Sequence, residues 1–336
     1  MLFDTAPANQ LVGIARLAAA SEILESKSRV QYFDLPTRQF IGRCSGSRMP
    51  FVWTLNPYRG CEFGCKYCYA RFAHEFMELR EPGQFETKIY AKQFSAHAFR
   101  AELSKVKRGE SIWMGTATDP YQPAERRFGI TRQILEVLAE QKGHKMGITT
   151  KSDLIGRDAD LLGRLARRNV LHINLTITTL DAALARALEP LAPRPQLRLA
   201  AIRKLADAGV RVTVLANPVL PLITDSFENL DSVCAAAQAA GAASFSAAPV
   251  FLKPCAQNVF FPFLESRFPH LLRRYRERFE RGAYLKGDYP EILRERVKEI
   301  VSRRKMKPRD ADYEPEEWAG EPQMNLFAGA REFQAR

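Results

Sequence analysis

Residues 56–71 read NPYRGCEFGCKYCYAR, and this stretch gathers three cysteines, Cys61, Cys65 and Cys68, into eight consecutive residues. Their spacing is Cys-x3-Cys-x2-Cys, with Gly60 and Gly64 in the same loop. Glycine lets a backbone turn tightly around a bulky group and keeps peptide amides near the sulfurs. The stretch therefore predicts a metal centre that is held by thiolates.

The number of cysteines separates two kinds of metal centre. Structural zinc sites normally take four ligands in two separated pairs. This sequence has no second pair, and the nearest further ligand is His74. A [4Fe-4S] cluster normally takes four thiolates, so three thiolates leave one iron without a protein ligand. A cluster that binds a substrate needs such an open iron, whereas in a pure electron carrier a fourth protein ligand occupies that iron. The three-cysteine loop therefore favours a reactive cluster.

The composition describes a large globular protein. The chain has 336 residues, of which 46% are hydrophobic, enough for one large domain with extensions or for two domains. It has no run of about 18 apolar residues, so no membrane-spanning helix is expected. The N-terminal MLFDTAPANQ has no basic lead, unlike a signal peptide. Six cysteines, three of them clustered, favour a reducing, cytoplasmic compartment.

From residue 51 to residue 250, short apolar runs alternate with helical patterns. The helical segments end at glycines such as Gly143 and begin at capping residues such as Thr224–Asp225, which are ordinary helix boundaries. Repeated strand–helix units predict parallel strands joined by crossover helices. The six strand candidates are residues 51–55, 111–118, 144–150, 169–179, 210–219 and 242–251.

Polar and reactive residues follow these strand candidates. Because the carboxyl ends of parallel strands build the site in α/β sheets and barrels, we expect these residues to lie near one another. Polar loops at a protein surface give the same pattern without any function. The residues are Thr118–Asp119, Lys151–Ser152, Thr178–Thr179, Asn217–Pro218 and Lys253.

The net charge of +12 favours a polyanionic partner such as nucleic acid, although a generic basic surface gives the same total. The sequence divides into an N-terminal extension (1–50), a strand–helix region (51–257), a basic helical region (258–310) and a flexible tail (311–336). In the basic region, aromatic residues such as Tyr275 and Phe279 interleave with arginines. That pattern fits a nucleic-acid face or an amphipathic helix with a solvated basic side.

The CEFGCKYC motif resembles the signature of the radical S-adenosylmethionine (SAM) family, with Tyr67 just before the last cysteine. The motif follows the first strand candidate, as it does in that family, and the resemblance extends from about residue 50 to residue 252. It implies an incomplete (β/α)6 barrel. Four further segments look more narrowly like the spore photoproduct lyase-related branch: GTATDPYQPAE, ITTKSDLIGRDADLL, TLDAALARALEP and NPVLPLITD.

The resemblance implies that Cys61, Cys65 and Cys68 hold a [4Fe-4S] cluster whose open iron binds SAM. Reductive cleavage of SAM would give methionine and a 5′-deoxyadenosyl radical, which abstracts a hydrogen atom. Tyr67 would lie against the adenine, and the Gly115–Asp119 loop would contact the SAM amino group. Lys151 or Ser152 would hold the carboxylate or ribose. The implied SAM contacts are Tyr67, Gly115, Thr116, Thr118, Asp119, Lys151, Ser152 and Asn217.

The narrower resemblance implies further catalytic residues. Tyr67 and Tyr69 flank Cys68 as two tyrosines flank the last cluster cysteine in the lyase, where they relay a hydrogen atom. The lyase also uses a cysteine donor roughly forty residues beyond its cluster. This chain has no cysteine between Cys68 and Cys234, and Trp113 lies near the matching position. Cys255 is the candidate replacement donor, and Cys44 is a second one.

Three functions remain open at this point. The first is a radical SAM enzyme acting on nucleic acid, either as a repair-like lyase or in base modification. The second is a radical SAM enzyme acting on a protein or small molecule, and the third is a non-catalytic iron–sulfur or zinc protein that binds nucleic acid. The enzymes would need a reductase or flavodoxin-type electron donor. The tail segment Gln323–Phe327, QMNLF, resembles the Gln-x-x-Leu-Phe peptide that docks bacterial repair proteins on the sliding clamp.

Overall fold

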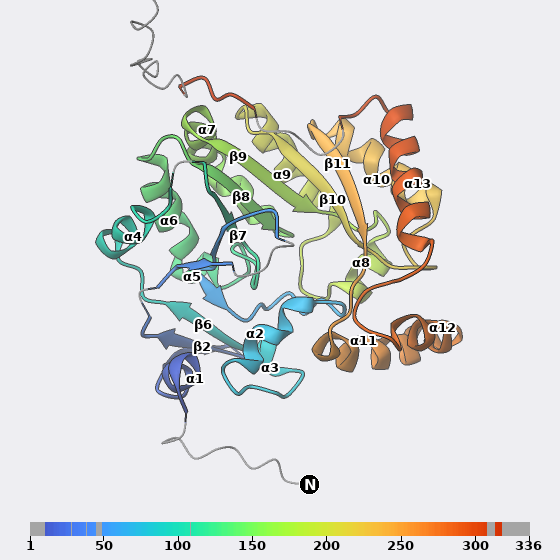
Figure 1. The fold of residues 1–336 in the computed structure, drawn as a ribbon, viewed down its shortest axis with the longest axis horizontal. Helices are drawn as coiled ribbons and strands as arrows, with labels where there is room; N and C mark the ends of the chain where they lie inside the picture. The colour runs from blue at the N-terminus through green and yellow to red at the C-terminus, as the bar shows by residue number, and fades with distance from the viewer. Residues whose placement is uncertain are drawn as a thin grey trace, which may run out of the picture.

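The computed structural model describes residues 11–27, 29–37, 39–44, 49–107, 109–307 and 313–317. Its larger sheet has the strand order β11-β10-β9-β8-β7-β4-β3, in which only β3 (Ile41–Arg43) runs antiparallel to its neighbour. The six parallel strands match the six candidates and curve into a partial barrel (Figure 1). They are β4 (Trp53–Leu55), β7 (Ser111–Met114), β8 (Lys145–Thr150), β9 (Val170–Thr176), β10 (Val212–Val219) and β11 (Ser244–Pro249). The predicted α/β fold is confirmed.

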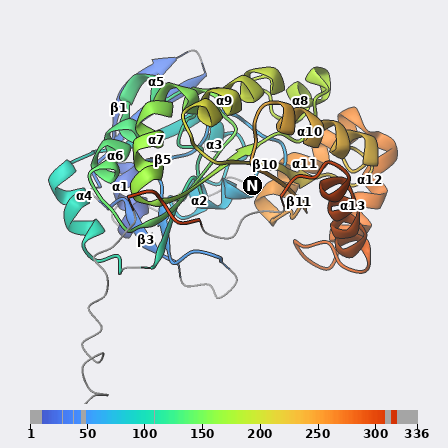
Figure 2. The same cartoon turned by 90° about the horizontal axis from the view of Figure 1, so that it is seen from above.

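Helices cover the convex face of this sheet (Figure 2). Capping side chains start several of them: Ser95 accepts a hydrogen bond from the amide of Ala98, and Asp181 accepts from the amides of Ala183 and Leu184. The helix predicted to begin at Thr224–Asp225 is capped instead by Ser226. The helices are α4 (Ala96–Leu103), α5 (Glu125–Phe128), α6 (Ile130–Ala139), α7 (Ala159–Arg168), α8 (Ala182–Leu188), α9 (Pro195–Asp207) and α10 (Phe227–Ala239).

Side chains alternate between the two faces of the strands. Ile112 and Met114 join the hydrophobic core, while Trp113 between them points to the concave face. Its ring covers Gly147, where a Cβ atom would lie 2.3 Å from it. The Trp113 indole donates a 3.0 Å hydrogen bond to Thr149 Oγ1. Only glycine at position 147 leaves room for this indole.

A second sheet was not predicted: two of its strands precede the barrel in the sequence, and the other two lie between β4 and β7. Its strand order is β1-β2-β6-β5, from β1 (Glu22–Lys27), β2 (Val30–Leu35), β6 (Lys88–Lys92) and β5 (Tyr58–Arg59). Helix α1 (Gly13–Ala19) packs against it through Ala18 in a small cluster with Leu35, Met77 and Tyr90. Since β5 leads directly into the cysteine loop, this sheet fixes where that loop begins.

The C-terminal helices are α11 (Pro254–Arg267), α12 (Pro269–Phe279) and α13 (Tyr289–Arg303). Helices α11 and α12 share a hydrophobic cluster with Phe63 and Tyr67 of the cysteine loop. Helix α13 packs against α10 and β11. The predicted limit between the barrel and the basic region, at residues 257 and 258, falls inside α11.

Within the predicted tail, the side chain of Tyr313 contacts the barrel. Its hydroxyl accepts a hydrogen bond from the amide of Leu171 at 3.1 Å and lies 3.2 Å from the carbonyl oxygens of Ala166 and Asn169. Gln323–Phe327 lies outside the described residues, so its resemblance to a clamp-binding peptide stays a prediction.

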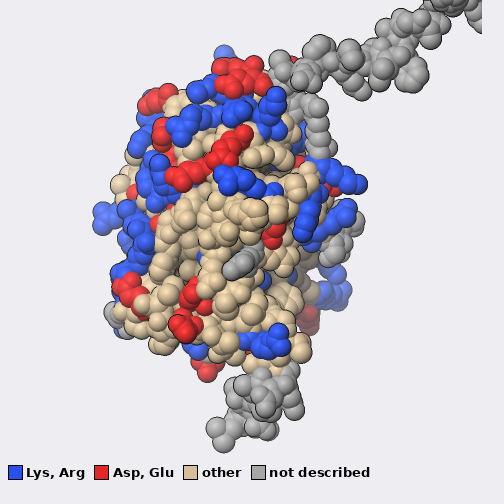
Figure 3. Space-filling model, turned by 90° about the vertical axis from the view of Figure 1, so that its left-hand side faces the viewer, with Lys and Arg blue, Asp and Glu red and all other residues tan. Residues whose placement is uncertain are grey.

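Positively charged side chains are spread over the face of the molecule shown in Figure 3. Lys and Arg side chains intermix there with Asp and Glu around a central area without charged residues. None of the helices in the described ranges is long and apolar enough to cross a membrane.

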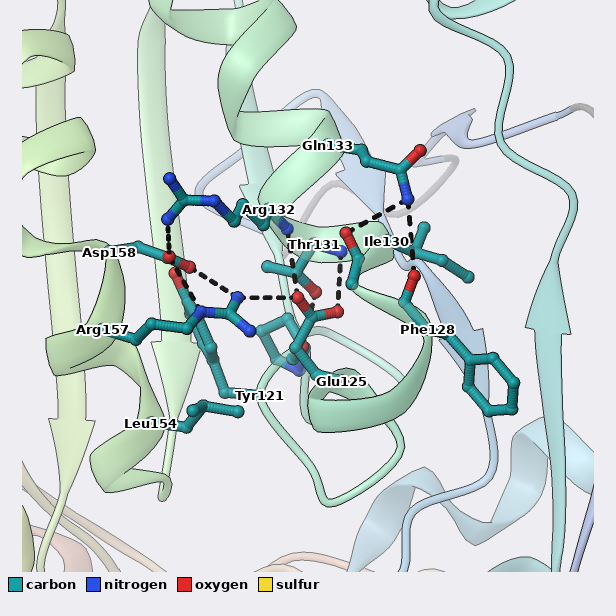
Figure 4. A network of polar contacts seen from close by, with 12 residues as sticks. Tyr121, Glu125, Phe128, Ile130, Thr131, Arg132, Gln133, Leu154, Arg157 and Asp158 are labelled. Carbon is teal, nitrogen blue, oxygen red and sulfur yellow. Dashed lines mark hydrogen bonds and ion pairs between the residues drawn. The ribbon is translucent and has the colours of Figure 1, made fainter.

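A buried ionic network joins α5 and α6 to the 3-10 segment η3 (Asp153–Asp158) (Figure 4). The Glu125 carboxylate is fully buried and accepts hydrogen bonds from Tyr58 Oη at 2.6 Å, the Thr131 amide at 2.8 Å and Arg157 Nη2 at 2.8 Å. Arg157 also pairs with the buried Asp158 at 2.8 Å. Because every charge in the network has a partner, burial is tolerated.

We expect Glu125→Gln to lower the free energy of unfolding by about 1.5–3 kcal/mol, because an amide cannot satisfy all of these donors. Urea unfolding measures the change. Glu136→Gln is the matched control, since Glu136 is exposed and pairs only at the surface with Arg132, and such pairs contribute about 0–1 kcal/mol. Equal losses in the two variants would contradict the assignment of Glu125 as the centre of the network.

Candidate active site

The cysteine loop is held at its first turn by Gly60. This residue has a φ of +80°, and a Cβ atom there would lie 2.7 Å from the carbonyl oxygen of Lys88 and 2.9 Å from that of Phe85. The amide of Cys61 donates to the same Phe85 carbonyl at 2.9 Å. A side chain at position 60 would push the loop off β6, so the glycine sets the position of the first cysteine.

The three thiols lie near one another in an apolar surrounding. Cys61 and Cys65 are each 8% exposed, and Cys68 is half-buried. Burial raises the pKa of all three, and the negative charge of Cys68 adds to this effect at Cys61 and Cys65. In the part of the chain that the structure describes, no three Cys, His, Asp or Glu side chains converge to hold a single metal ion. The thiols are thus within electrostatic reach of one another.

Tyr67 belongs to a buried polar group that the sequence did not predict. Its hydroxyl donates to Glu189 Oε1, and Arg198 Nη2 donates to Glu189 Oε2 at 2.5 Å. Arg198 also donates to the carbonyl oxygens of Thr176 at 2.9 Å and Pro193 at 2.8 Å. Glu189 and Arg198 are each only 1% exposed. The group therefore holds the Tyr67 ring in one orientation beside the cysteines.

Lys151 lies on this ring, with its Nζ 5.7 Å from the ring centroid. Burial disfavours its ammonium group, but the nearby Cys65 and Glu189 outweigh burial and raise the pKa of Lys151. Burial raises the pKa of Asp119 in spite of hydrogen bonds from Thr150 Oγ1 at 2.6 Å and the Lys151 amide at 2.8 Å. Asp119 in turn raises the pKa of Cys61. The structure thus brings Lys151 and Asp119 to the cysteine loop.

The other predicted cofactor contacts mainly shape the loops around the cysteines. Gly115 has a φ of +89°, and a Cβ atom there would lie 2.4 Å from the carbonyl oxygen of Thr149. Thr118 Oγ1 donates to the carbonyl oxygen of Gly60 at 2.5 Å. Ser152 Oγ accepts from the amide of Leu154 at 3.2 Å and caps η3. These contacts join the ends of β7 and β8 to the cysteine loop.

Asn217, at the end of β10, has a buried Oδ1 without a hydrogen-bond partner among the described residues. A buried polar atom of this kind costs free energy unless it is satisfied. Its position at the carboxyl end of a barrel strand is where α/β barrels bind their ligands. Asn217 Oδ1 is thus an acceptor that the N–H group of a ligand can satisfy.

A cavity of about 1020 Å³ opens beside the cysteine loop. Tyr69 lines it, is 36% exposed, and donates its hydroxyl proton to the carbonyl oxygen of Thr116 at 2.8 Å. Asn56 fixes the same Thr116 by accepting from its amide at 3.1 Å and donating to its Oγ1 at 2.9 Å. The predicted residues Tyr69 and Thr116 therefore meet at the edge of an open cavity.

The candidate hydrogen donors lie on different sides of Tyr69. Cys255 Sγ is 3.9 Å from the carbonyl oxygen of Tyr69 and borders a separate pocket of about 40 Å³. Cys44 is half-buried and lines the large cavity. Trp113, near the position of the lyase donor, covers Gly147 on the concave face of the barrel. Of these three side chains, only Cys44 borders the cavity that Tyr69 lines.

The chain is similar to known proteins in sequence and in fold. Residues 55–232 match the family model described as the radical SAM superfamily. An uncharacterized protein of Mycobacterium bovis is 33% identical over 88% of this chain and 86% of its own length. One from Methanocaldococcus jannaschii is 30% identical over 52% of this chain and 62% of its own length.

Solved structures of spore photoproduct lyase variants share the fold. One variant superposes with a TM-score of 0.63 at 14% identity, covering 89% of this chain and 86% of its own. Another, with bound AdoMet and dinucleoside spore photoproduct, superposes with a TM-score of 0.61 at 16% identity and the same coverage.

Proposed function

This chain belongs to the radical SAM superfamily, whose members use a [4Fe-4S] cluster and SAM, and we propose that Cys61, Cys65 and Cys68 are the cluster ligands. Two features support this fit. The thiols are free, with Cys61 and Cys65 buried and Cys68 half-buried, and the loop around them is built on Gly60 and Gly64, which both have a positive φ. A cluster with three protein ligands keeps one iron open for SAM.

The surrounding residues suit the groups of SAM. When bound, a cluster reduced by an external donor would pass one electron to SAM, which would give methionine and a 5′-deoxyadenosyl radical able to abstract a hydrogen atom from the substrate. The half-buried Lys151 ammonium suits the SAM carboxylate, because charge-assisted contacts are strong where little water is present. Asp119 suits the amino group, and the unpartnered Asn217 Oδ1 suits the adenine amino group. Tyr67, fixed by Glu189, shields this region from solvent.

We propose that the substrate is a nucleic acid, acted on in a repair-like lyase or base-modification reaction. The single observation that carries this proposal is the lining of the large cavity. Among the described residues, its cations are Arg59, Lys92 and Lys253, and it has no acidic side chain. Its remaining large side chains are mostly aromatic: Phe40, Phe51, Tyr58, Tyr69, Phe72, Phe76, Phe251 and Tyr284. Aromatic faces and cations together are how proteins hold unpaired bases and their phosphates.

Five of these rings form a row that we call the aromatic row, made of Phe76, Phe72, Tyr69, Phe251 and Tyr284. Neighbouring ring centroids lie 5.8, 6.5, 4.8 and 5.3 Å apart along it. Its ends are open, since Phe76 is 61% and Tyr284 55% exposed. The Lys253 ammonium lies 3.6 Å from the centroid of the Phe72 ring. The row leads from solvent to Tyr69, next to the last cluster cysteine.

The partners follow from this proposal. The exposed arginines of α12, such as Arg273, would add to phosphate contacts and make binding weaken with salt. A reductase or flavodoxin-type protein would supply the electron. Docking on a sliding clamp through Gln323–Phe327 would place the enzyme on DNA.

We expect Tyr284→Ala to weaken the binding of single-stranded DNA to the holoenzyme roughly 5- to 150-fold, because stacking contributes about 1–3 kcal/mol per base. Fluorescence anisotropy with a labelled oligonucleotide at fixed salt measures the change. Ile292→Ala is the control, since Ile292 is 54% exposed on α13 and does not line the cavity.

Two results would redirect the proposal. If both variants bind as the parent does, the aromatic row does not hold bases, and a protein or small-molecule substrate is favoured. If DNA binds but no deoxyadenosine forms in a protein with its full iron content, a binding role without catalysis is favoured.

A further inference from the structure

Two cations at the inner wall of the large cavity lie on neighbouring strands of the four-stranded sheet. Arg59 on β5 pairs in register with Tyr90 on β6, and Lys92 follows Tyr90 by two residues. Residues two apart on a strand share a face, and diagonal cross-strand neighbours are within reach of long side chains. Arg59 and Lys92 therefore point to the same side of the sheet, and both line the cavity.

Neither cation is neutralised by the protein. The Arg59 Nε is buried without a hydrogen-bond partner, and no carboxylate pairs with this guanidinium within the described ranges. Lys92 is 8% exposed and donates to the Gln39 carbonyl oxygen at 2.9 Å, which leaves capacity for further hydrogen bonds. Glu102 acts on Lys92 electrostatically, but one of its carboxylate oxygens already accepts from the amides of Phe40 and Ile41 at 2.9 and 3.1 Å. A buried lysine beside a half-buried arginine is costly unless an anion joins them.

We infer that Arg59 and Lys92 form an anion subsite that binds a phosphate group of the substrate. This inference rests on the proposed nucleic-acid function and deepens it. Guanidinium groups match phosphate oxygens through paired N–H donors, and a lysine adds a point charge. A phosphate on this wall would leave the attached nucleoside free to lie against the aromatic row, on the side of the cavity where Tyr69 sits. The subsite thus selects nucleotides over nucleosides.

The protonation state of Lys92 should make phosphate binding at this subsite depend on pH. Burial and then the charge of Arg59 on β5 lower the pKa of Lys92 to about 7, against the opposing effect of Glu102 on α4. A phosphodiester keeps one negative charge across this range, so the pH changes only the protein side of the contact. Binding of a dinucleoside monophosphate should therefore weaken as the pH rises through about 7 and be insensitive in Lys92→Met.

The test compares thymidine, thymidylyl-thymidine and inorganic phosphate for binding to the reconstituted holoenzyme by calorimetry without reductant. The parent should bind the dinucleoside monophosphate at least about tenfold more tightly than thymidine, as expected of a charge-assisted contact. Arg59→Met should abolish that preference. Arg80→Met, which removes an exposed charge paired with Glu78 outside the cavity, should keep it. Arg59→Lys keeps the charge and should keep part of the preference, even if Arg59→Met folds poorly.

The outcomes separate this inference from the proposed function. Equal binding of thymidine and the dinucleoside monophosphate to the parent overturns the anion subsite while nucleic-acid recognition survives. Inorganic phosphate binding that Arg59→Met abolishes, with no nucleoside or dinucleoside binding, supports an anion subsite and overturns the nucleic-acid function. Preference that survives in both Arg59→Met and Lys92→Met also overturns the subsite.

Discussion

Cys65→Ala is expected to abolish the reductive cleavage of SAM to 5′-deoxyadenosine in protein that is still folded. The proposal makes Cys65 one of only three thiolate ligands, so the variant cannot hold the cluster. Replacing a residue that only supports a metal ligand typically lowers metal affinity or activity 10–100-fold. Loss of a ligand itself should therefore lower the rate of SAM cleavage by more than about a hundredfold. The Cys65 side chain makes no hydrogen bond with any residue in the described ranges, and its carbonyl oxygen accepts from the Cys68 amide and from Arg71. The substitution therefore leaves the fold of the loop in place.

Chromatography of deoxyadenosine after anaerobic reconstitution and reduction measures this loss. Cys234→Ala is the matched control, because Cys234 is also buried but contacts Met306 Sδ at 3.5 Å in the core. It should retain cleavage at nearly the parental rate. Cleavage by Cys65→Ala at that rate would remove the cluster assignment.

Arg198→Met is expected to lower the free energy of unfolding by about 3–5 kcal/mol, because it strands a buried carboxylate. Glu189 is 1% exposed and accepts hydrogen bonds from Arg198, the hydroxyl of Tyr67 and, at 3.5 Å, Thr178 Oγ1, so that Arg198 is the only cation that hydrogen-bonds it among the described residues. The Coulombic pull of Arg198 and then Lys151 overcomes burial and lowers the pKa of Glu189. Removing Arg198 would raise that pKa, so the loss in stability should shrink as the pH falls and Glu189 becomes protonated.

Urea unfolding of a double-variant cycle separates the pair from its surroundings. Arg198→Met with Glu189→Gln removes both charges and keeps an acceptor for Tyr67, so it should recover most of the lost stability. Arg164→Met is the control, since Arg164 is exposed and its 3.4 Å contact with Asp160 lies at the surface. An Arg198→Met variant as stable as Arg164→Met would contradict a structural role for the pair.

The barrel could be predicted from sequence because its strands are buried and its helices have clear boundaries. Strand β9 is buried at nearly every position, and parallel strands of this kind appear as continuous apolar runs. The four-stranded sheet could not be predicted in the same way. Every residue of β1 is exposed, and the burial of β2 repeats every third residue instead of every second. Neither strand shows the alternation that marks a half-buried strand.

The candidate site was predictable where its residues are close in sequence or follow a strand. The cysteine loop, Asp119, Lys151 and Asn217 belong to this class. Glu189 could not be found, because its contact with Tyr67 spans 122 residues of sequence. The choice between Cys255 and Cys44 as hydrogen donor likewise depends on contacts between distant parts of the sequence. Only the fold shows that Cys44 lines the large cavity and that Cys255 lines a separate small pocket.

The central claim is that this radical SAM enzyme takes a hydrogen atom from a nucleic acid, and deuterium transfer tests it most directly. Cells grown in heavy water supply deuterated nucleic-acid, protein and small-molecule fractions, and each is offered to the reduced holoenzyme with unlabelled SAM. Mass spectrometry then measures deuterium in 5′-deoxyadenosine and in recovered SAM, so that both consumption and regeneration of SAM are detected. The account predicts deuterium from the nucleic-acid fraction and none with Cys65→Ala. Deuterium from the protein or small-molecule fraction alone would contradict it.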